Sequence, residues 1–137
     1  MLSKIDKEMA FVQNALNLRA RRQEILASNI ANSDTPNYKA RDMDFRAALA
    51  SALGAGGGSM TLAKTSARHL DAGAAGGQAG GAHIKFRAAL QPSLDGNTVD
   101  PNVERAQFTE NALHYQFLID RATSTFRTLG RALESGR

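Results

Sequence analysis

The sequence predicts a mainly α-helical protein in which two long terminal helices form an antiparallel, coiled-coil-like pair around an extended, Gly/Ala-rich central segment. Apolar residues recur in steps of four and three near both ends of the 137-residue chain. Nine of the 12 glycines fall between Gly54 and Gly81, where a packed core cannot form. We therefore divide the chain into an N-terminal helix (1–33), a turn, extended arm and central region (34–99), and a C-terminal helix (100–137).

The N-terminal helix is expected to begin after Ser3, with Asp6 in its first turn, where the helix dipole favours an acid. About 30 helical residues extend roughly 45 Å, which is too long for a minimal globule. Seven of the nine positions along one face are apolar. These positions are Leu2, Ile5, Met9, Val12, Leu16, Arg19, Gln23, Leu26 and Ile30.

The C-terminal helix has clearer signals at its start. Asp100 is a suitable N-cap, Pro101 suits the first helical position, and Glu104 falls in the first turn. Its main apolar row consists of Phe108, Ala112, Tyr115, Ile119, Ala122, Phe126, Leu129 and Leu133, and a second row of Val103, Ala106, Leu113, Phe117 and Leu118 widens the face.

One neighbouring helix cannot cover so wide an apolar face. Burying a side chain such as Phe126 or Ile119 contributes on the order of 1.5–3 kcal/mol. We therefore expect other molecules to complete the apolar stripes of the two terminal helices. The predicted assembly seam comprises Phe108, Tyr115, Ile119, Phe126, Leu129 and Leu133 of the C-terminal helix, with Val12, Leu16, Leu26 and Ile30 of the N-terminal helix.

Between the first helix and the central region, the chain makes a closely specified corner. Pro36 prevents the helix from continuing and pushes Thr35 towards extended geometry, while residues 39–45 alternate as an extended arm does. We expect this corner to set how the arm of one subunit lies against the next. A local explanation holds as well: Asn32 and Asp34 end the helix, and Tyr38 packs back onto Ile30. The signature corner consists of Asn29, Ala31, Asn32, Thr35, Pro36 and Tyr38.

No pattern indicates catalysis, a cofactor or a metal. The absence of cysteine excludes disulfides and cysteine-based zinc sites. The histidines lie at positions 69, 83 and 114, and none has a second ligand at helical spacing. The acids Asp42 and Asp44 flank Met43 on the extended arm, where we expect solvent or an arginine of another subunit beside them.

The net charge of +4 and the pI of about 9.9 raise the possibility of a nucleic-acid partner. The arginines are mixed with acids on helical faces, and no aromatic platform accompanies them, so no nucleic-acid binding is expected. No run approaches the roughly 18 apolar residues that a membrane span requires. The charges of residues 4–8 do not suit a cleaved signal peptide.

Residues 27–39 resemble the signature near the N-terminus of bacterial flagellar rod and hook proteins, and residues 40–45 are most similar to proximal rod subunits. Residues 62–70 and 95–106 agree with that narrower match. Asn37 stands where the family usually has glycine. Because asparagine is the next best residue for a left-handed backbone, the turn is expected to survive.

The resemblance to the flagellar basal-body rod family implies a structural subunit that polymerises through its terminal helices into a tubular drive shaft. It implies copies of the chain, other rod subunits, basal-body base components and the flagellar export apparatus as partners. It also implies a rod that crosses the periplasm, with subunits exported without a cleaved signal peptide.

Three alternatives remain at the level of sequence. A self-contained helical bundle would form extra helices at residues 44–53 and 86–90. A helical adaptor or secreted protein would bind a foreign helix one-to-one, and a basic DNA-associated protein would bind with a steep salt dependence.

Overall fold

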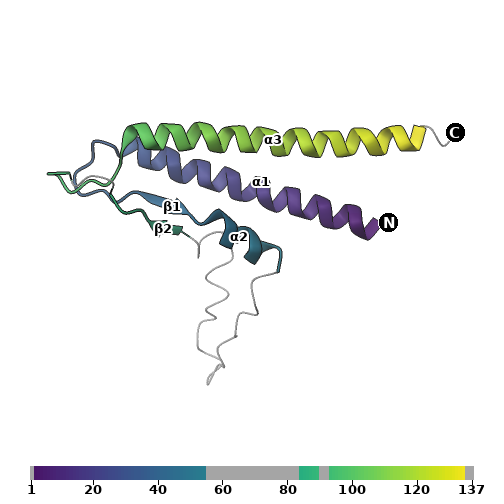
Figure 1. The fold of residues 1–137 in the computed structure, drawn as a ribbon, viewed down its shortest axis with the longest axis horizontal. Coiled ribbons are helices and arrows are strands. Elements are labelled where there is room, and N and C mark those ends of the chain that lie inside the picture. Colours follow the sequence, from purple (N-terminus) through teal and green to yellow (C-terminus); the bar gives the residue numbers. More distant parts are fainter. Residues whose placement is uncertain (1, 55–83, 90–92, 135–137) are drawn as a thin grey trace, which may run out of the picture.

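The computed structural model describes residues 2–54, 84–89 and 93–134. Along the chain these form helix α1 (Leu2–Ala31), strand β1 (Arg41–Met43), helix α2 (Phe45–Ala52), strand β2 (Ile84–Phe86) and helix α3 (Pro101–Glu134). The long helices α1 and α3 run antiparallel, so both termini lie at one end and the signature corner lies at the other (Figure 1). The Gly/Ala-rich tracts of residues 55–83 lie outside the described residues.

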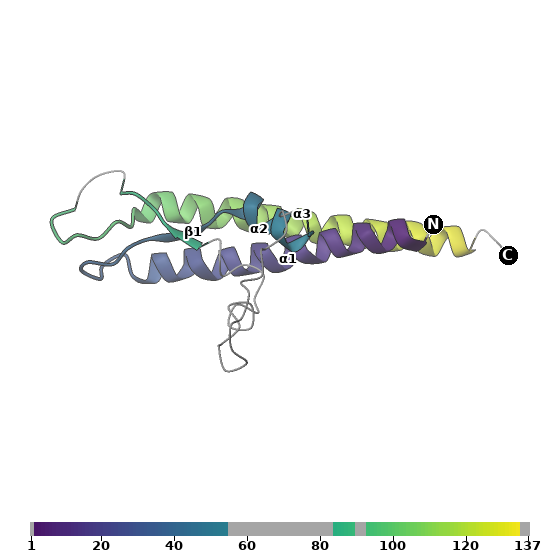
Figure 2. The same ribbon diagram turned by 90° about the horizontal axis from the view of Figure 1, so that it is seen from below.

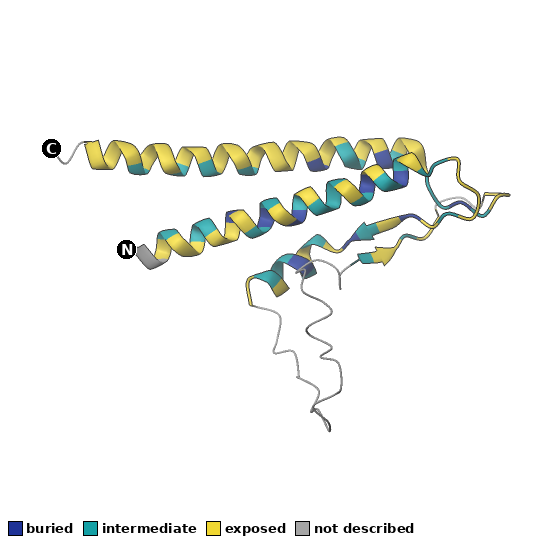
Figure 3. Cartoon of the chain, turned by 180° about the vertical axis from the view of Figure 1, so that it is seen from behind, coloured by how far each residue is buried: buried dark blue, intermediate teal, exposed yellow. Residues whose placement is uncertain are grey.

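The predicted pair of long terminal helices is confirmed, and the two helices are in closest association near the corner. They separate towards the termini in the view of Figure 1. The buried residues of α3 are Glu104 and Asn111, both in the part of the helix near the corner, and the rest of α3 is largely exposed (Figure 3). The two helices are therefore packed against each other near the corner and separated near the termini.

The second layer contains β1, β2 and α2. The two strands pair antiparallel in the register Arg41↔Phe86, Asp42↔Lys85 and Met43↔Ile84. Helix α2 begins after Asp44, whose side chain accepts a hydrogen bond from the backbone N–H of Ala47 at 3.1 Å. Figure 2, seen from below, shows β1 and α2 lying across the pair of long helices.

A small apolar core joins this second layer to α1. Leu18, Met43 and Ala48 are buried together, and the partly buried side chains packed against them are Ile25, Phe45, Leu49 and Ala52. Helix α1 therefore has two packed faces: one meets α3, and the other meets β1 and α2.

The structure changes several local expectations. Helix α1 begins at Leu2, and Asp6 falls beyond a first turn that contains no acid, while the side chain of Ser3 lies outside the described part of the structure. The start of α3 is confirmed, because the Asp100 side chain accepts from the backbone N–H of Asn102 at 3.0 Å.

The extended arm is confirmed over β1, and a helix also forms at residues 45–52. The helix considered for residues 86–90 is wrong over its described part: Phe86 ends β2, and residues 87–89 are not helical. The backbone N–H and C=O groups of β2 form hydrogen bonds with β1, in place of the internal bonds that a helix would make. Within the described residues, no helix combines the length and hydropathy of a membrane span.

Candidate functional site

The signature corner begins where α1 ends. The backbone N–H of Asn32 donates to the carbonyl oxygens of Ser28 and Asn29 at 3.2 and 3.1 Å, and its side-chain Nδ2 donates to the Ser28 carbonyl at 2.8 Å. The Thr35 hydroxyl donates to Asn32 Oδ1 at 3.2 Å. Asn37 has a φ of 61°, so the left-handed turn expected at this position is confirmed. Asn32 thus caps the helix with both its backbone and its side chain.

The segment before α3 lies alongside the arm that leaves this turn. The backbone N–H of Asn37 donates to the Asp95 carbonyl at 2.8 Å, and the N–H of Thr98 donates to the Tyr38 carbonyl at 3.1 Å. The Thr98 hydroxyl accepts from the N–H of Ala40 at 2.8 Å. Two segments nearly 60 residues apart in sequence therefore close the corner within one chain.

Asn97 holds the turn from the inside. Its side chain is 5% exposed, and its oxygen accepts from the N–H of Val99 at 2.8 Å. The preceding Gly96 has a φ of 72°, and a Cβ atom there would lie 2.7 Å from Asn37 Oδ1. Glycine adopts this positive φ without the strain that a Cβ atom would bring. Asn97 Nδ2 lies within hydrogen-bond distance of the carbonyl oxygens of Asn32 (3.1 Å), Ser33 (2.7 Å) and Thr35 (3.1 Å).

Asn29 is fully buried beneath the corner, and its amide is satisfied on both sides. Its Nδ2 donates to the Arg41 carbonyl at 2.7 Å and to Glu104 Oε2 at 3.0 Å. Its Oδ1 accepts from the Arg41 N–H at 3.1 Å and from the Tyr38 hydroxyl at 3.3 Å. One side chain of α1 thus fixes both the start of β1 and the first turn of α3.

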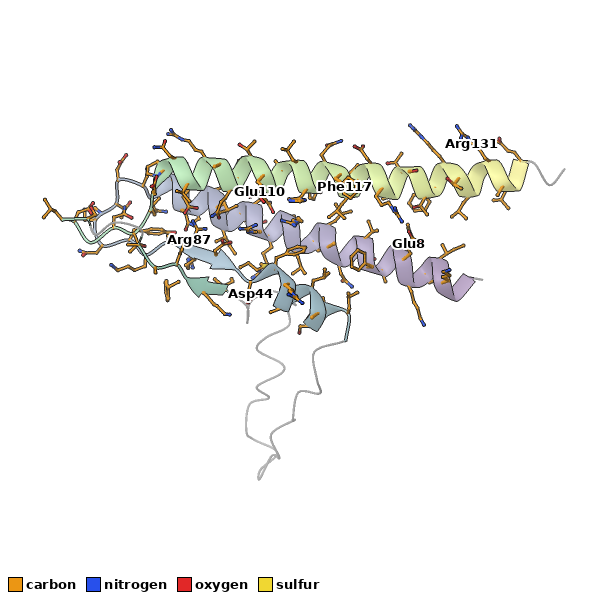
Figure 4. The ribbon with its side chains drawn as sticks, in the orientation of Figure 1. Glu8, Asp44, Arg87, Glu110, Phe117 and Arg131 are labelled. Atoms are coloured by element: carbon orange, nitrogen blue, oxygen red, sulfur yellow. The ribbon has the colours of Figure 1, made fainter. Side chains whose placement is uncertain are left out.

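Two arginines extend this network into an ionic cluster. Arg87 donates to Glu104 Oε1 at 2.5 Å, to Asp42 Oδ2 at 2.9 Å and to Gln107 Oε1 at 2.7 Å. Arg22 donates two parallel hydrogen bonds to the Asp42 carboxylate, from Nε at 2.9 Å and from Nη2 at 3.0 Å. Arg87 lies between the strands and the long helices (Figure 4). The six residues Arg22, Asn29, Asp42, Arg87, Glu104 and Gln107 are called the polar cluster below.

The charges of the polar cluster act on the pKa of Asp42. Burial alone would raise that pKa, but the hydrogen bonds from Arg22 and from the Met43 N–H, with the charges of Arg22 and Arg87, hold it below its ordinary value of 3.8. The bond to Asp42 in turn raises the pKa of Arg22. The expectation of solvent or another subunit's arginine beside Asp42 is therefore wrong, because two arginines of the same chain occupy that place.

A second polar layer lies in the middle of the α1–α3 contact. Asn111 is fully buried and donates to the Arg19 carbonyl at 2.9 Å and to Gln23 Oε1 at 2.6 Å. Arg19 Nη1 donates back to Asn111 Oδ1 at 3.2 Å. The two polar positions in the otherwise apolar row of α1 are thus the partners of one asparagine, which fixes the register of the helices.

Comparison with known proteins identifies the chain. The model of the family described as "Flagella basal body rod protein" matches residues 9–39, which cover most of α1 and the signature corner. The flagellar basal body rod protein FlgB of Escherichia coli K12 is 44% identical over 139 residues, covering 99% of both chains. FlgB of Salmonella typhimurium LT2 is 45% identical over the same length and coverage. FlgB of Cereibacter sphaeroides ATCC 17029 is 53% identical over 102 residues, covering 74% of both chains.

This chain belongs to the FlgB family of flagellar basal body rod proteins. The family expected from residues 27–45 is therefore confirmed. A match over almost the whole length does not favour the alternative of an adaptor for a foreign helix.

In this FlgB-family chain, the predicted assembly seam lies partly in the intramolecular contact and partly on its flank. Val12 and Leu26 are buried, and Leu16, Ile30, Phe108 and Leu129 are half-buried. The exposed members are Tyr115 (36%), Ile119 (37%), Phe126 (61%) and Leu133 (78%).

The remaining predicted positions have these surroundings. Within the signature corner, Ala31, Thr35 and Pro36 are exposed, and Tyr38 is half-buried with its hydroxyl 3.3 Å from Ser28 Oγ. His114 is exposed, 3.8 Å from Glu110. His69 and His83 lie outside the described residues, and among the residues described no three potential ligands gather around a metal site.

A groove of about 570 Å³ runs along the contact between α1 and α3. Its walls are mainly apolar, with small alanines from both helices and the rings of Phe108 and Tyr115. We call it the helix groove. Its lining residues are Arg19, Ala20, Gln23, Glu24, Ala27, Phe108, Asn111, Ala112, Tyr115 and Gln116.

Sequence reasoning missed the residues that hold the site together. Arg87, Asn97 and Asn111 were not singled out, although Asn97 follows Gly96 in a recognisable turn. For Asn111, the available signal was the pair of polar positions, Arg19 and Gln23, in the apolar row of α1. A polar break in such a row points to a polar partner on the facing helix.

Proposed function

We propose that this chain is a structural subunit of the proximal rod of the bacterial flagellum, polymerising through its terminal helices into the tubular drive shaft. The observation that carries the proposal is the apolar surface that α3 leaves exposed, in a chain that matches FlgB over nearly its full length. Phe126 and Leu133, seven residues apart on one face of this 34-residue helix, are 61% and 78% exposed, and Phe117 is 66% exposed on the opposite face. Apolar side chains exposed in this way favour covering by neighbouring subunits.

The energetics support a polymer more than an isolated hairpin. Covering a large apolar side chain contributes on the order of 1.5–3 kcal/mol. Ile119, Phe126 and Leu133 are exposed in the C-terminal half of α3, a part of the helix that Figure 3 shows as largely exposed. Many helix–helix contacts in register share a torsional load, which suits a shaft that transmits torque. In this proposal the assembled helices surround the export channel.

The polar cluster has a defined place in this function. It ties α1, β1 and α3 together through directional bonds, so the arm and the two helices keep one relative orientation. A subunit of a shaft requires such a fixed corner, because a hinge there would let each subunit yield under load.

The partners follow from the same proposal. They are copies of this chain, other rod subunits, components of the basal-body base and the flagellar export apparatus. The subunit acts in the rod that crosses the periplasm and reaches it through that apparatus. It needs no cofactor and performs no catalysis.

Substitution of Phe126 by aspartate tests the proposal in a strain that lacks its own copy of the gene. We expect Phe126→Asp to abolish swimming in soft agar and to be absent from purified basal bodies, while the subunit is still secreted. Phe126→Leu, which keeps an apolar side chain, is the matched control and should retain motility. Normal basal bodies built with Phe126→Asp would contradict the proposal, as would failure of the unaltered chain to restore motility.

A further inference from the structure

Strand β2 makes few contacts of its own with the rest of the molecule. Its three residues pair with β1, and an isolated two-stranded ladder is only marginally stable in water. Phe86 is 74% exposed, and the 3.2 Å ion pair between Lys85 and Asp44 joins exposed groups, so it contributes little. Ile84 is half-buried. The strand itself therefore contributes little to its own docking.

The next residue, Arg87, provides the contacts that β2 lacks. Its backbone N–H donates to the Ala40 carbonyl at 2.8 Å, which extends the pairing of the two segments beyond the strands. Its guanidinium points towards the long helices (Figure 4) and donates to Asp42 of β1 and to Glu104 of α3. We call residues 84–87 the strap. One side chain thus connects the strap to the first turn of α3.

The two carboxylates that Arg87 contacts differ in their other partners. Asp42 also accepts two hydrogen bonds from Arg22. Glu104 is 1% exposed, and among the described residues Arg87 is the one cation within ion-pair distance of it. The other partner of this carboxylate is the neutral amide of Asn29, at 3.0 Å. Removing the strap therefore leaves Asp42 paired but leaves Glu104 without a counter-ion.

The Glu104 carboxylate lies where the two long helices meet. Glu104 is in the first turn of α3, and Asn29 is in the last turn of α1, at the corner where the helices are in closest association. Without the strap, water is the group left to stabilise this charge, and water entering here competes for the bond between Glu104 and Asn29. Loss of the strap therefore weakens the α1–α3 contact at the corner, although no residue of either helix has changed.

We infer that the strap controls the closure of the corner, because the two long helices lock together at Glu104 only when Arg87 is docked beside it. The coupling is reciprocal: a change that loosens the α1–α3 contact at Glu104 also removes an acceptor that holds the strap. The corner thus has two states, locked with the strap docked and loose without it. Residues 84–87 must therefore reach β1 before the helix pair becomes rigid. This inference concerns the chain itself and goes beyond the proposed rod function.

Hydrogen exchange of the purified full chain, followed by mass spectrometry, measures the strap and the helices separately. Arg87→Met removes the charge and keeps an unbranched side chain. We expect exchange about tenfold faster in residues 101–111 of α3 as well as in the strap, with residues 119–134 changing by less than about twofold. Lys85→Met is the matched control, because it removes an exposed cation from the same strap, and it should leave residues 101–111 within about twofold of the unaltered chain.

A second substitution distinguishes a conditional lock from an ordinary stabilising contact. Glu104→Gln removes the buried charge, so the corner of the Arg87→Met, Glu104→Gln double variant holds no unpaired carboxylate. We expect exchange in residues 101–111 of this double variant to lie within about threefold of the Glu104→Gln single variant, while the strap still exchanges rapidly. For an ordinary contact, the effects of the two substitutions would add.

Two results would overturn the inference. Fast exchange confined to the strap in Arg87→Met would show that strap and corner are not coupled. A double variant whose residues 101–111 exchange as fast as in Arg87→Met would show that the Glu104 charge is not the cause. Should Arg87→Met fail to fold, a folded double variant supports the inference and an unfolded one overturns it. None of these results depends on rod assembly, which the motility assay with Phe126→Asp tests separately.

Discussion

Replacing Glu104 by alanine removes the most deeply buried charge of the polar cluster. Glu104 is 1% exposed and accepts hydrogen bonds from Arg87 at 2.5 Å and from Asn29 at 3.0 Å. Removing one partner from a buried ion pair destabilises proteins by about 3–5 kcal/mol, because the other charge stays buried and uncompensated. In this variant, Arg87 still has its hydrogen bond to Asp42, and Asn29 still has its hydrogen bond to the Arg41 carbonyl, so part of the penalty is avoided. We therefore expect a loss of about 2–4 kcal/mol in the free energy of unfolding.

Urea denaturation of the purified chain, followed by far-UV circular dichroism, measures this loss. Glu110→Ala is the matched control on the same helix, since the Glu110 side chain is 64% exposed, and its effect should stay within about 0.5 kcal/mol. Glu104→Gln keeps the shape and one acceptor and should fall between the two. A loss below about 1 kcal/mol for Glu104→Ala would refute the argument that this carboxylate holds the corner.

Three further predictions follow from the same structure. Gly96→Ala should destabilise the chain by about 1–3 kcal/mol in urea denaturation, because of its positive φ and the 2.7 Å approach to Asn37, whereas Gly130→Ala, with open space around it, should stabilise α3 by up to about 1 kcal/mol. The lowered pKa of Asp42 contributes stability that is complete above its ordinary 3.8 and is lost as the pH falls through the folded value. Urea midpoints measured as a function of pH should therefore fall at acid pH for the unaltered chain, and the part of this fall that is due to Asp42 should be missing in Asp42→Asn. We expect the ends of the two long helices to become ordered only on assembly, so circular dichroism of the dilute monomer should show less helix than the 30- and 34-residue helices would give. A fully helical monomer that melts cooperatively would contradict this expectation.

The sequence was sufficient to predict the long helices, the corner and the start of α3, because each rests on local chemistry. Apolar periodicity marks the two helices, and Asp100 followed by Pro101 specifies an N-terminus. The left-handed turn at Asn37 was predictable because few other residue types tolerate that conformation.

The contact line between α1 and α3 was not predictable from apolar periodicity alone. The buried positions of α3 are Glu104 and Asn111, whereas the strongest apolar row, which includes Phe126 and Leu133, lies to one side. A search for apolar residues therefore finds the surface that the isolated chain leaves uncovered. The intramolecular contact is marked instead by polar residues whose partners are distant in sequence, such as Arg87 for Glu104.

Polar residues at the centre of the α1–α3 contact have a physical reason in an assembly subunit. An apolar seam of uniform side chains allows two helices to slide by a turn at small cost, but Asn111 loses its bonds to Arg19 and Gln23 in any shifted register. The apolar residues are then left for contacts between subunits, where burial contributes most to association. Within the proposed rod, this division places specificity inside the subunit and the driving force for polymerisation on its surface. A chain with the opposite arrangement would fold stably alone and have little reason to assemble.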